Sequence, residues 1–234
     1  MLHAALGHDF ATSATRDVDL ALALSGWETY ETLSNAFPRA GDSGLAFKIA
    51  GLNVDLIPFG ALEEPKGTIV PPTRGDPISV WAFAEILSSS FPLVLSQALT
   101  IRCPTVPGYT AAKLAAWLDR SEWGLTKDAN DIALVAYWYA ESEHVANRLY
   151  ETPDGIEVLV AEEADVPRAA ARLLGRDVSE SVGAERLNEL LARWPGDLEM
   201  LVNNFVVSRG PRSGLLPRRR EIIDALTRGL AVPL

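Results

Sequence analysis

The hydrophobic periodicity of the chain changes near residue 106, and this change limits the folds that the chain can adopt. Before it, short runs that alternate apolar and polar residues are separated by glycine and proline, a pattern typical of β-strands. After Pro107, apolar residues recur at the spacing of an α-helix, and the proline is well placed at a helix start. The sequence therefore predicts an α+β chain with two domains, residues 1–106 and residues 107–234.

Turn-forming residues divide both regions into shorter elements. In the first region we predict strands over residues 17–22, 45–49, 52–57, 93–95 and 99–102, and helices over residues 27–37 and 81–87. In the second region we predict helices over residues 109–118, 128–140, 144–150, 166–174, 184–194, 198–206 and 218–230. Ala50 and Gly51 separate two of the strands, which indicates a hairpin turn.

The composition is typical of a globular protein. Of the 234 residues 48% are apolar, which is enough to bury a core. No apolar run reaches the roughly 18 residues of a membrane-spanning helix, and the first residues lack the basic region of a secretory signal. The single cysteine, Cys103, excludes an internal disulfide. We therefore expect a cytoplasmic protein that makes no membrane contact.

The net charge of −10 argues against nucleic-acid binding through the average field of the protein. A local basic patch is the alternative, and one is formed near the C-terminus by Arg209, Arg212, Arg218, Arg219 and Arg220. Two interpretations of this patch stay open. It is either the solvated surface of a loop and a helix start, or a contact surface for RNA or for an acidic partner.

The strongest indication of chemistry is the pair Asp17 and Asp19, separated by Val18. On a strand, residues two apart point to the same face, so the two carboxylates project together while Val18 faces a core. Like charges held side by side repel each other unless a cation lies between them. Mg²⁺ in proteins typically binds one or two carboxylates together with substrate phosphates. By itself such a pair is more often a solvated strand end.

A third carboxylate strengthens the case for a metal. Asp55 lies in an otherwise apolar predicted strand, on the opposite face from Val54 and Leu56. A charge in such a strand is costly unless it is paired or binds a metal. We expect Asp17, Asp19 and Asp55 to converge on neighbouring strands, as in sites where two metal ions hold the reacting oxygens of a phosphoryl transfer. A structural aspartate with satisfied hydrogen bonds is the alternative.

Four segments carry a resemblance to a known family. They are residues 15–22 (TRDVDLAL), 53–60 (NVDLIPFG), 113–120 (KLAAWLDR) and 127–132 (KDANDI). Their order and spacing resemble the minimal nucleotidyltransferases of the DNA polymerase β superfamily, of the kind found in AbiEii/AbiGii-type toxins. The resemblance covers about half of the chain. It implies a mixed sheet with flanking helices, followed by a helical C-terminal region.

The resemblance also implies roles for individual residues. Asp17, Asp19 and Asp55 would hold Mg²⁺ or Mn²⁺, and Asp55 could help to activate the acceptor hydroxyl. Lys113 would contact the triphosphate of an NTP, and Asp128 would be the acid of the family's second helix motif. Asp131 lies on the same helix face three residues further on. An ion pair of Lys113 with these two aspartates that only orients the helices is the alternative, and the two readings are compatible.

The nucleotide-binding turn departs from the family's pattern. Thr15 lies where the family often has serine or threonine beside the site. The family's Gly-Ser or Gly-Ala turn, whose backbone N–H groups hold the triphosphate, should precede the carboxylate pair. The nearest candidate is Leu6-Gly7-His8, in which a histidine replaces the small residue and the spacing is short. We therefore expect weak NTP binding.

The expected function is the transfer of NMP from an NTP to a hydroxyl acceptor. The family resemblance offers a tRNA 3′ end or a protein side chain as the acceptor, and a toxin–antitoxin pair with a cognate antitoxin as the setting. Two alternatives stay open. One is a catalytically silent binding or regulatory module with the same fold, and the other is a nucleotidyltransferase for a small molecule.

Overall fold

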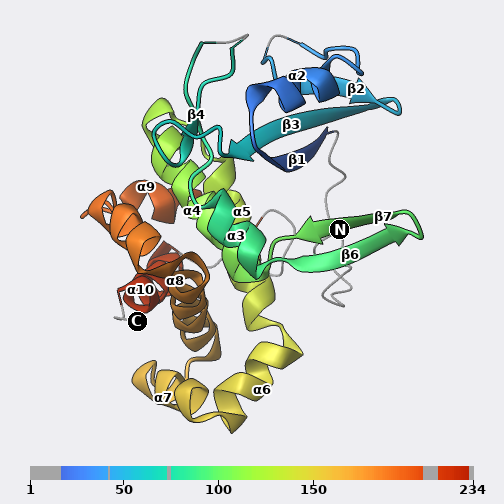
Figure 1. Ribbon diagram of the computed structural model, residues 1–234. Coiled ribbons are helices and arrows are strands. Elements are labelled where there is room, and N and C mark those ends of the chain that lie inside the picture. The colour runs from blue at the N-terminus through green and yellow to red at the C-terminus, as the bar shows by residue number, and fades with distance from the viewer. Residues whose placement is uncertain (1–16, 42, 73–74, 208–215, 232–234) are drawn as a thin grey trace. The chain divides into compact units, whose positions relative to one another are not determined.

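The computed structural model describes residues 17–41, 43–72, 75–207 and 216–231 (Figure 1). The chain divides into two compact units, one within Asp9–Ala84 and the other formed mainly by Glu85–Leu234. We call the first the sheet unit and the second the helical unit, and describe each by itself. The predicted α+β class is confirmed. The sequence had suggested a boundary at residue 106, whereas the structural division follows Ala84.

A three-stranded mixed sheet forms the centre of the sheet unit. Its strands are β1 (Asp17–Leu24), β2 (Ala46–Ile49) and β3 (Leu52–Gly60), in the order β1-β3-β2. β1 runs parallel to β3, and β2 runs antiparallel to it. Helix α2 (Trp27–Ser34) follows β1. The predicted hairpin turn joins β2 and β3, and Ala50 and Gly51 both have the positive φ that a two-residue hairpin turn of type I′ requires.

One face of this sheet is buried beneath α2 (Figure 1). Phe47, Val54 and Leu56 are at most 5% exposed and pack with Tyr30 of α2. The Tyr30 hydroxyl donates to the Leu56 carbonyl oxygen at 3.2 Å, which anchors the helix on the sheet. Apolar residues therefore alternate in β1 and β3 because one face of each strand packs against a core.

The rest of the sheet unit is irregular. It contains a short pair of strands, β4 (Thr68–Ile69) and β5 (Ile78–Ser79), which were not predicted. A second apolar cluster lies here, formed by Phe59, Leu62, Ile69 and Val80. Strands of two residues carry too little periodicity to be recognised in a sequence.

The helical unit begins within a short helix, continues with a β-hairpin and then consists of helices. Helix α3 (Phe83–Ser89) leads into the hairpin of β6 (Phe91–Ser96) and β7 (Leu99–Cys103). The helices that follow are α4 (Val106–Arg120), the 3₁₀ turn η1 (Ser121–Trp123), α5 (Lys127–Ala140), α6 (Glu143–Glu151), α7 (Pro153–Ala161), α8 (Val166–Ala192), α9 (Glu199–Asn204) and α10 (Leu216–Leu230). Thr105 caps α4, with its hydroxyl accepting from the N–H of Gly108, and Pro107 lies in the first turn as predicted.

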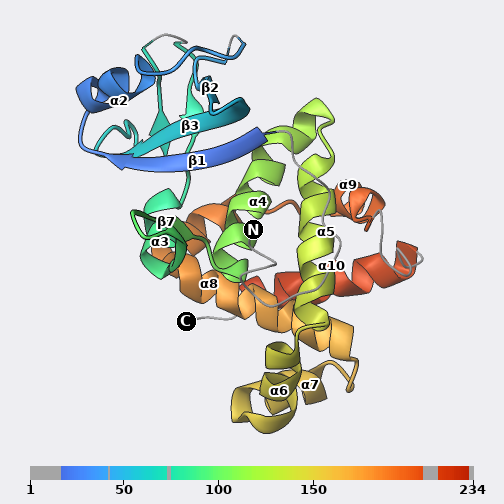
Figure 2. The ribbon, with the colours of Figure 1, turned by 90° about the vertical axis from the view of Figure 1, so that its right-hand side faces the viewer.

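Helix α8 is the central element of this unit, since α4, α5, α6, α7 and α10 all contact it (Figure 2). Its apolar face is fully buried at Leu173, Leu174 and Val178. α10 packs most closely against it, with Gly229 of α10 against Gly175 of α8. Two glycines at the contact let the two backbones approach more closely than side chains would permit.

Two expectations for this region need correction. Residues 166–174 and 184–194 were expected to form separate helices, and α8 does consist of two helical segments that meet at a kink at Gly183, where φ is 75°. The first segment, however, continues past Leu174 as far as the kink, and the second ends at Ala192. Helix α7 was not predicted at all. It starts at Pro153, and the hydroxyl of Thr152 accepts from the N–H of Gly155 at 3.2 Å. Within the described residues, no helix is both long and apolar enough to cross a membrane.

Candidate functional site

Asp19 and Asp55 lie next to each other on the face of the sheet opposite α2. The parallel pairing of β1 with β3 places Asp19 in register with Asp55, and Asp17 in register with Asn53. Residues in register on neighbouring strands share a face and are about 4.8 Å apart along the hydrogen-bonding direction. Asp19 is exposed and Asp55 is half-buried. The predicted placement of Asp19 and Asp55 on one face is therefore found in the strand register.

The rest of this face is suited to a ligand that approaches the two carboxylates. Ala21 and Ala23 follow Asp19 on the same face of β1, and both are exposed. Their small side chains leave room above the sheet, whereas Val18 and Leu20 turn to the core on the other side. Two like charges on neighbouring strands favour a bound cation between them, and carboxylate oxygens are the ligands that Mg²⁺ and Mn²⁺ prefer.

Two residues of the predicted site, Asp17 and Thr15, lie partly or wholly outside the described residues. The backbone of Asp17 belongs to β1, but its side chain and the whole of Thr15 lie outside the described residues, as does Leu6-Gly7-His8. In the part of the chain that the structure describes, no group of three or more histidine, cysteine or acidic side chains is arranged to hold a metal ion. Of the three predicted ligands, the structure thus places Asp19 and Asp55 side by side, and metal binding by the set stays a prediction.

The second set of predicted residues lies in the helical unit, on the neighbouring helices α4 and α5. The Nζ atom of Lys113 is 2.6 Å from Oδ2 of Asp131 and 3.4 Å from Oδ1 of Asp128. Arg120 approaches the other oxygen of Asp128 at 3.4 Å through Nη1. The Lys113 ammonium also lies 5.4 Å from the centre of the Tyr109 ring, within the range of a cation–π contact. The structure therefore brings Lys113, Asp128 and Asp131 together as one cluster.

The charged side chains of this cluster stabilise one another in their ionised forms. Asp128 is only 2% exposed, so its carboxylate depends on Lys113 and Arg120 for compensation. Burial by itself would lower the pKa of Lys113, but the neighbouring Tyr109, Asp131 and Asp128 outweigh it and raise the pKa to about 12. The ion pair that orients α4 and α5 is thus present. The predicted contact of Lys113 with a triphosphate, and a cleft shared with Asp19 and Asp55, stay predictions.

Sequence reasoning missed two members of the cluster, Arg120 and Tyr109. Arg120 lies seven residues after Lys113 on α4, and Tyr109 lies four residues before it. Both spacings return to the same face of a helix, so the sequence predicts that Tyr109 and Arg120 lie on the face of α4 that carries Lys113.

The basic patch near the C-terminus is largely neutralised where the structure describes it. Arg218 binds the carboxylate of Asp165, with distances of 2.6 and 2.7 Å to its two oxygens. Arg220 pairs with Glu199, and Arg219 donates to the carbonyl oxygen of Asn203. Arg209 and Arg212 lie outside the described residues. The three described arginines thus have partners within the protein, which favours the structural interpretation of the patch over a contact surface for RNA.

Removing the charge of Lys113 is expected to lower stability by roughly 2 kcal/mol at pH 7, because a pKa raised from 10.5 to about 12 corresponds to that difference. Lys113→Met keeps the length of the side chain and leaves Asp128 with Arg120 as its cationic partner. Since the pKa is raised in the folded state, the contribution is complete below pH 10.5 and is lost as the pH rises through 12. Urea unfolding at pH 7 and pH 9 should therefore show the same deficit.

Lys127→Met is the matched control for this variant. Lys127 starts α5, is exposed, and makes no ion pair with a described residue. It should leave the free energy of unfolding unchanged within about 0.5 kcal/mol. If Lys113→Met costs no more than Lys127→Met, the cluster does not stabilise the packing of α4 on α5.

Comparison with known proteins finds no matching family model, no similar curated protein and no similar solved structure.

Proposed function

We propose that the chain is a metal-dependent nucleotidyltransferase that moves NMP from an NTP to a hydroxyl acceptor. The observation that carries this proposal is the register of Asp19 with Asp55 on the exposed face of two parallel strands. The donor set fits Mg²⁺ or Mn²⁺, since both side chains offer hard anionic oxygens side by side. The family resemblance of the segments around Asp17, Asp55 and Lys113 adds the reaction class and a mixed sheet of the polymerase β type.

Each residue of the site would have its own role in an in-line displacement at the α-phosphorus. A bound divalent ion would supply charge neutralisation at the phosphates. Asp17 and Asp19 would hold it, and Asp55, half-buried beside Asp19, would accept the proton of the acceptor hydroxyl. The acceptor oxygen then forms a bond to the α-phosphorus while the bond from this phosphorus to the bridging oxygen breaks, and pyrophosphate leaves. Lys113 would bind the triphosphate as a point charge, and Asp128 and Asp131 would position its ammonium.

The biological setting of the proposal is a cytoplasmic toxin that is neutralised by a cognate antitoxin. The acceptor would be a tRNA 3′ end or a protein side chain. A second candidate is a catalytically silent module with the same fold. The ion pairs of Lys113 with Asp128 and Asp131 favour this candidate, because the two aspartates already neutralise the ammonium that would otherwise bind a triphosphate.

Asp19→Asn and Asp55→Asn are each expected to lower NMP transfer about a hundredfold, because removing one carboxylate weakens the hold on the cation at the reacting phosphate. The assay supplies each of the four NTPs labelled at the α-phosphate, with Mg²⁺ or Mn²⁺, and total tRNA or the protein itself as acceptor. Mn²⁺ binding, followed by electron paramagnetic resonance, should weaken in both variants.

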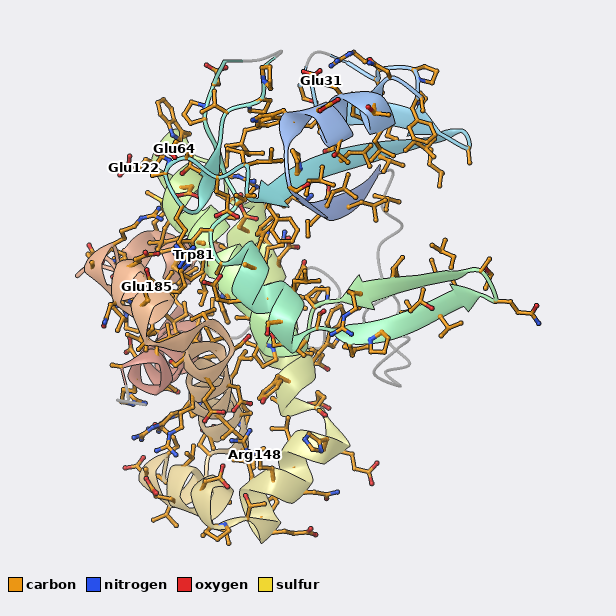
Figure 3. All side chains as sticks on the ribbon, viewed as in Figure 1. Glu31, Glu64, Trp81, Glu122, Arg148 and Glu185 are labelled. Carbon is orange, nitrogen blue, oxygen red and sulfur yellow. The ribbon has the colours of Figure 1, made fainter. Side chains whose placement is uncertain are left out.

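Glu31→Gln is the control in the same unit, since Glu31 lies on the outer surface of α2 (Figure 3) and is exposed. It should transfer NMP and bind Mn²⁺ as the original protein does. Mn²⁺ binding that depends on Asp19 and Asp55 without any transfer would favour the silent module. Mn²⁺ binding that neither substitution affects would overturn the metal site itself.

A further inference from the structure

A partly open cavity of about 620 Å³ lies within the helical unit. Its walls come from the start of α4, the end of α5, α6, α8 and the first residue of β6. The apolar part of the lining is Phe91, Val106, Pro107, Val135, Trp138 and Val145. Cavities of roughly 300–1,000 Å³ with mainly apolar walls and a few polar groups are typical of sites for small molecules.

A hydrogen-bonded network forms part of the lining of this cavity. Arg148 of α6, which lies between α6 and α8 in Figure 3, donates from Nη1 to both oxygens of Asp177 at 2.8 and 2.9 Å. Its Nε and Nη2 atoms donate to Oδ2 of Asp154 at 3.1 and 2.8 Å. The hydroxyl of Tyr139 donates to Asp177 as well. Burial and the charge of Asp177 raise the pKa of Tyr139 well above its usual range, so this hydroxyl stays protonated.

The network leaves Arg148 with little charge to offer to a ligand. Its guanidinium is shared between Asp177 and Asp154, which together carry two negative charges. Four of its N–H···O contacts are already made to these two carboxylates. An anionic ligand would therefore gain little from Arg148 and would approach Asp177 at close range.

Glu180 is the charged group of the lining that the network does not use. It lies on α8 three residues after Asp177, is exposed, and lines the cavity. It makes no ion pair and no hydrogen bond with a residue that the structure describes. Ser181 beside it is engaged with Ser89, and the hydroxyl of Thr105 caps α4. Apart from the imidazole of His144, which also lines the cavity, the charge available to a ligand here is the negative charge of Glu180.

We propose that this cavity binds a small molecule in which a cationic amine is attached to an aromatic or aliphatic body. The apolar body would pack against Trp138, Val135 and Phe91, where its burial supplies most of the binding free energy. The ammonium would pair with Glu180 at the polar rim. This site is independent of the proposed nucleotidyltransferase function, since it uses none of the residues assigned to that reaction.

Three probes of the same shape test the chemical class: 2-phenylethylamine, 2-phenylethanol and phenylacetate. They share an aromatic body and differ in carrying a cationic, a neutral or an anionic head. By ligand-observed NMR titration at pH 7, the amine should bind roughly tenfold more tightly than the alcohol, which corresponds to one charge-assisted hydrogen bond. Phenylacetate should bind more weakly than the alcohol. Equal affinity for all three, or binding of none, would overturn the proposal.

Glu180→Gln should remove the preference for the amine and leave the affinity for the alcohol unchanged. Because Glu180 is exposed and unpaired among the described residues, this variant should fold normally, which circular dichroism would verify. Glu151→Gln is the matched control, since Glu151 is an exposed residue of α6 that does not line the cavity. The control should retain the tenfold preference. A preference that survives in Glu180→Gln would show that the amine binds elsewhere.

Discussion

Gly229→Ala is expected to destabilise the helical unit by about 3 kcal/mol. A Cβ atom at Gly229 would lie 2.1 Å from the carbonyl oxygen of Arg172 and 2.9 Å from the Cα of Gly175. Both contacts are to backbone, so no rotation of a side chain relieves them, and α10 must move away from α8. Such a movement would open the contacts of Leu226 and Leu230, which are at most 1% exposed. Urea unfolding followed by circular dichroism measures the loss.

The result is informative because intrinsic helix propensity acts in the opposite direction. Alanine is favoured over glycine inside a helix by up to about 1 kcal/mol, so a substitution without a steric conflict should be neutral or stabilising. Gly196→Ala is the control for a substitution without a steric conflict. Gly196 lies in the loop between α8 and α9, is exposed, and a Cβ there would meet nothing within 4 Å. If Gly229→Ala were as harmless as Gly196→Ala, the close approach of α8 and α10 would not exist in solution.

This glycine contact also bears on why one helix was predicted too short. The helix expected over residues 166–174 stops just before Gly175, and an isolated glycine in a helical pattern often marks a helix end. In the structure Gly175 lies inside α8, because α10 packs against it and leaves no room for a side chain. A breaking glycine and a packing glycine look alike in a sequence. What distinguishes them is the partner helix, which begins about 40 residues later in the chain.

The sheet unit was more predictable, because its signals are local. β1 and β3 alternate apolar and polar residues since α2 covers one of their faces, and the Ala50-Gly51 turn fixes the register of β2 with β3. The pairing of Asp19 with Asp55 follows from the same alternation once the two strands are neighbours. That β1 and β3 are neighbours and run parallel depends on the topology of the sheet, which the local pattern of apolar and polar residues does not predict.

The charged cluster on α4 and α5 was predictable in part. Lys113 and the two aspartates were recognised through a resemblance, and the structure shows that they meet. The spacing places Arg120 on the same face of α4 as Lys113, but its pairing with Asp128 of another helix could not be read from that spacing. Charged pairs within one helix follow from spacing, whereas pairs between helices depend on how the helices pack.

The ion cluster around Glu162 is the clearest example of a feature that depends on packing. Glu162 follows the last turn of α7, and its side chain is only 1% exposed. Arg228 of α10 approaches it at 2.7 Å, and Arg168 and Arg172 of α8 at 3.0 and 3.2 Å. One buried carboxylate thereby links three helices. Burial by itself would raise the pKa of Glu162, but hydrogen bonds and charge from Arg228, Arg172 and Arg168 outweigh it, and the pKa is lowered.

Glu162→Gln is expected to lower the free energy of unfolding by about 3 kcal/mol at pH 7, the lower end of the range for breaking a buried ion pair. The amide keeps the volume of the side chain but turns an NH₂ donor toward guanidinium groups that are themselves donors. The arginines are partly exposed and recover some hydration, so a larger loss is not expected. Urea unfolding at a series of pH values measures the difference between the two proteins.

The pH dependence separates the lost charge from a simple packing defect. Because the pKa of Glu162 is lowered in the folded state, its contribution is complete above the unfolded pKa of about 4.3 and is lost as the pH falls through the folded value. The deficit of Glu162→Gln should therefore be constant from pH 7 to about pH 5 and shrink below that. Glu163→Gln is the control, since Glu163 is 83% exposed and pairs with Arg168 at 3.3 Å. It should cost less than about 0.5 kcal/mol at every pH, and a Glu162→Gln deficit that persists undiminished into acid would mean that packing rather than charge holds α7, α8 and α10 together.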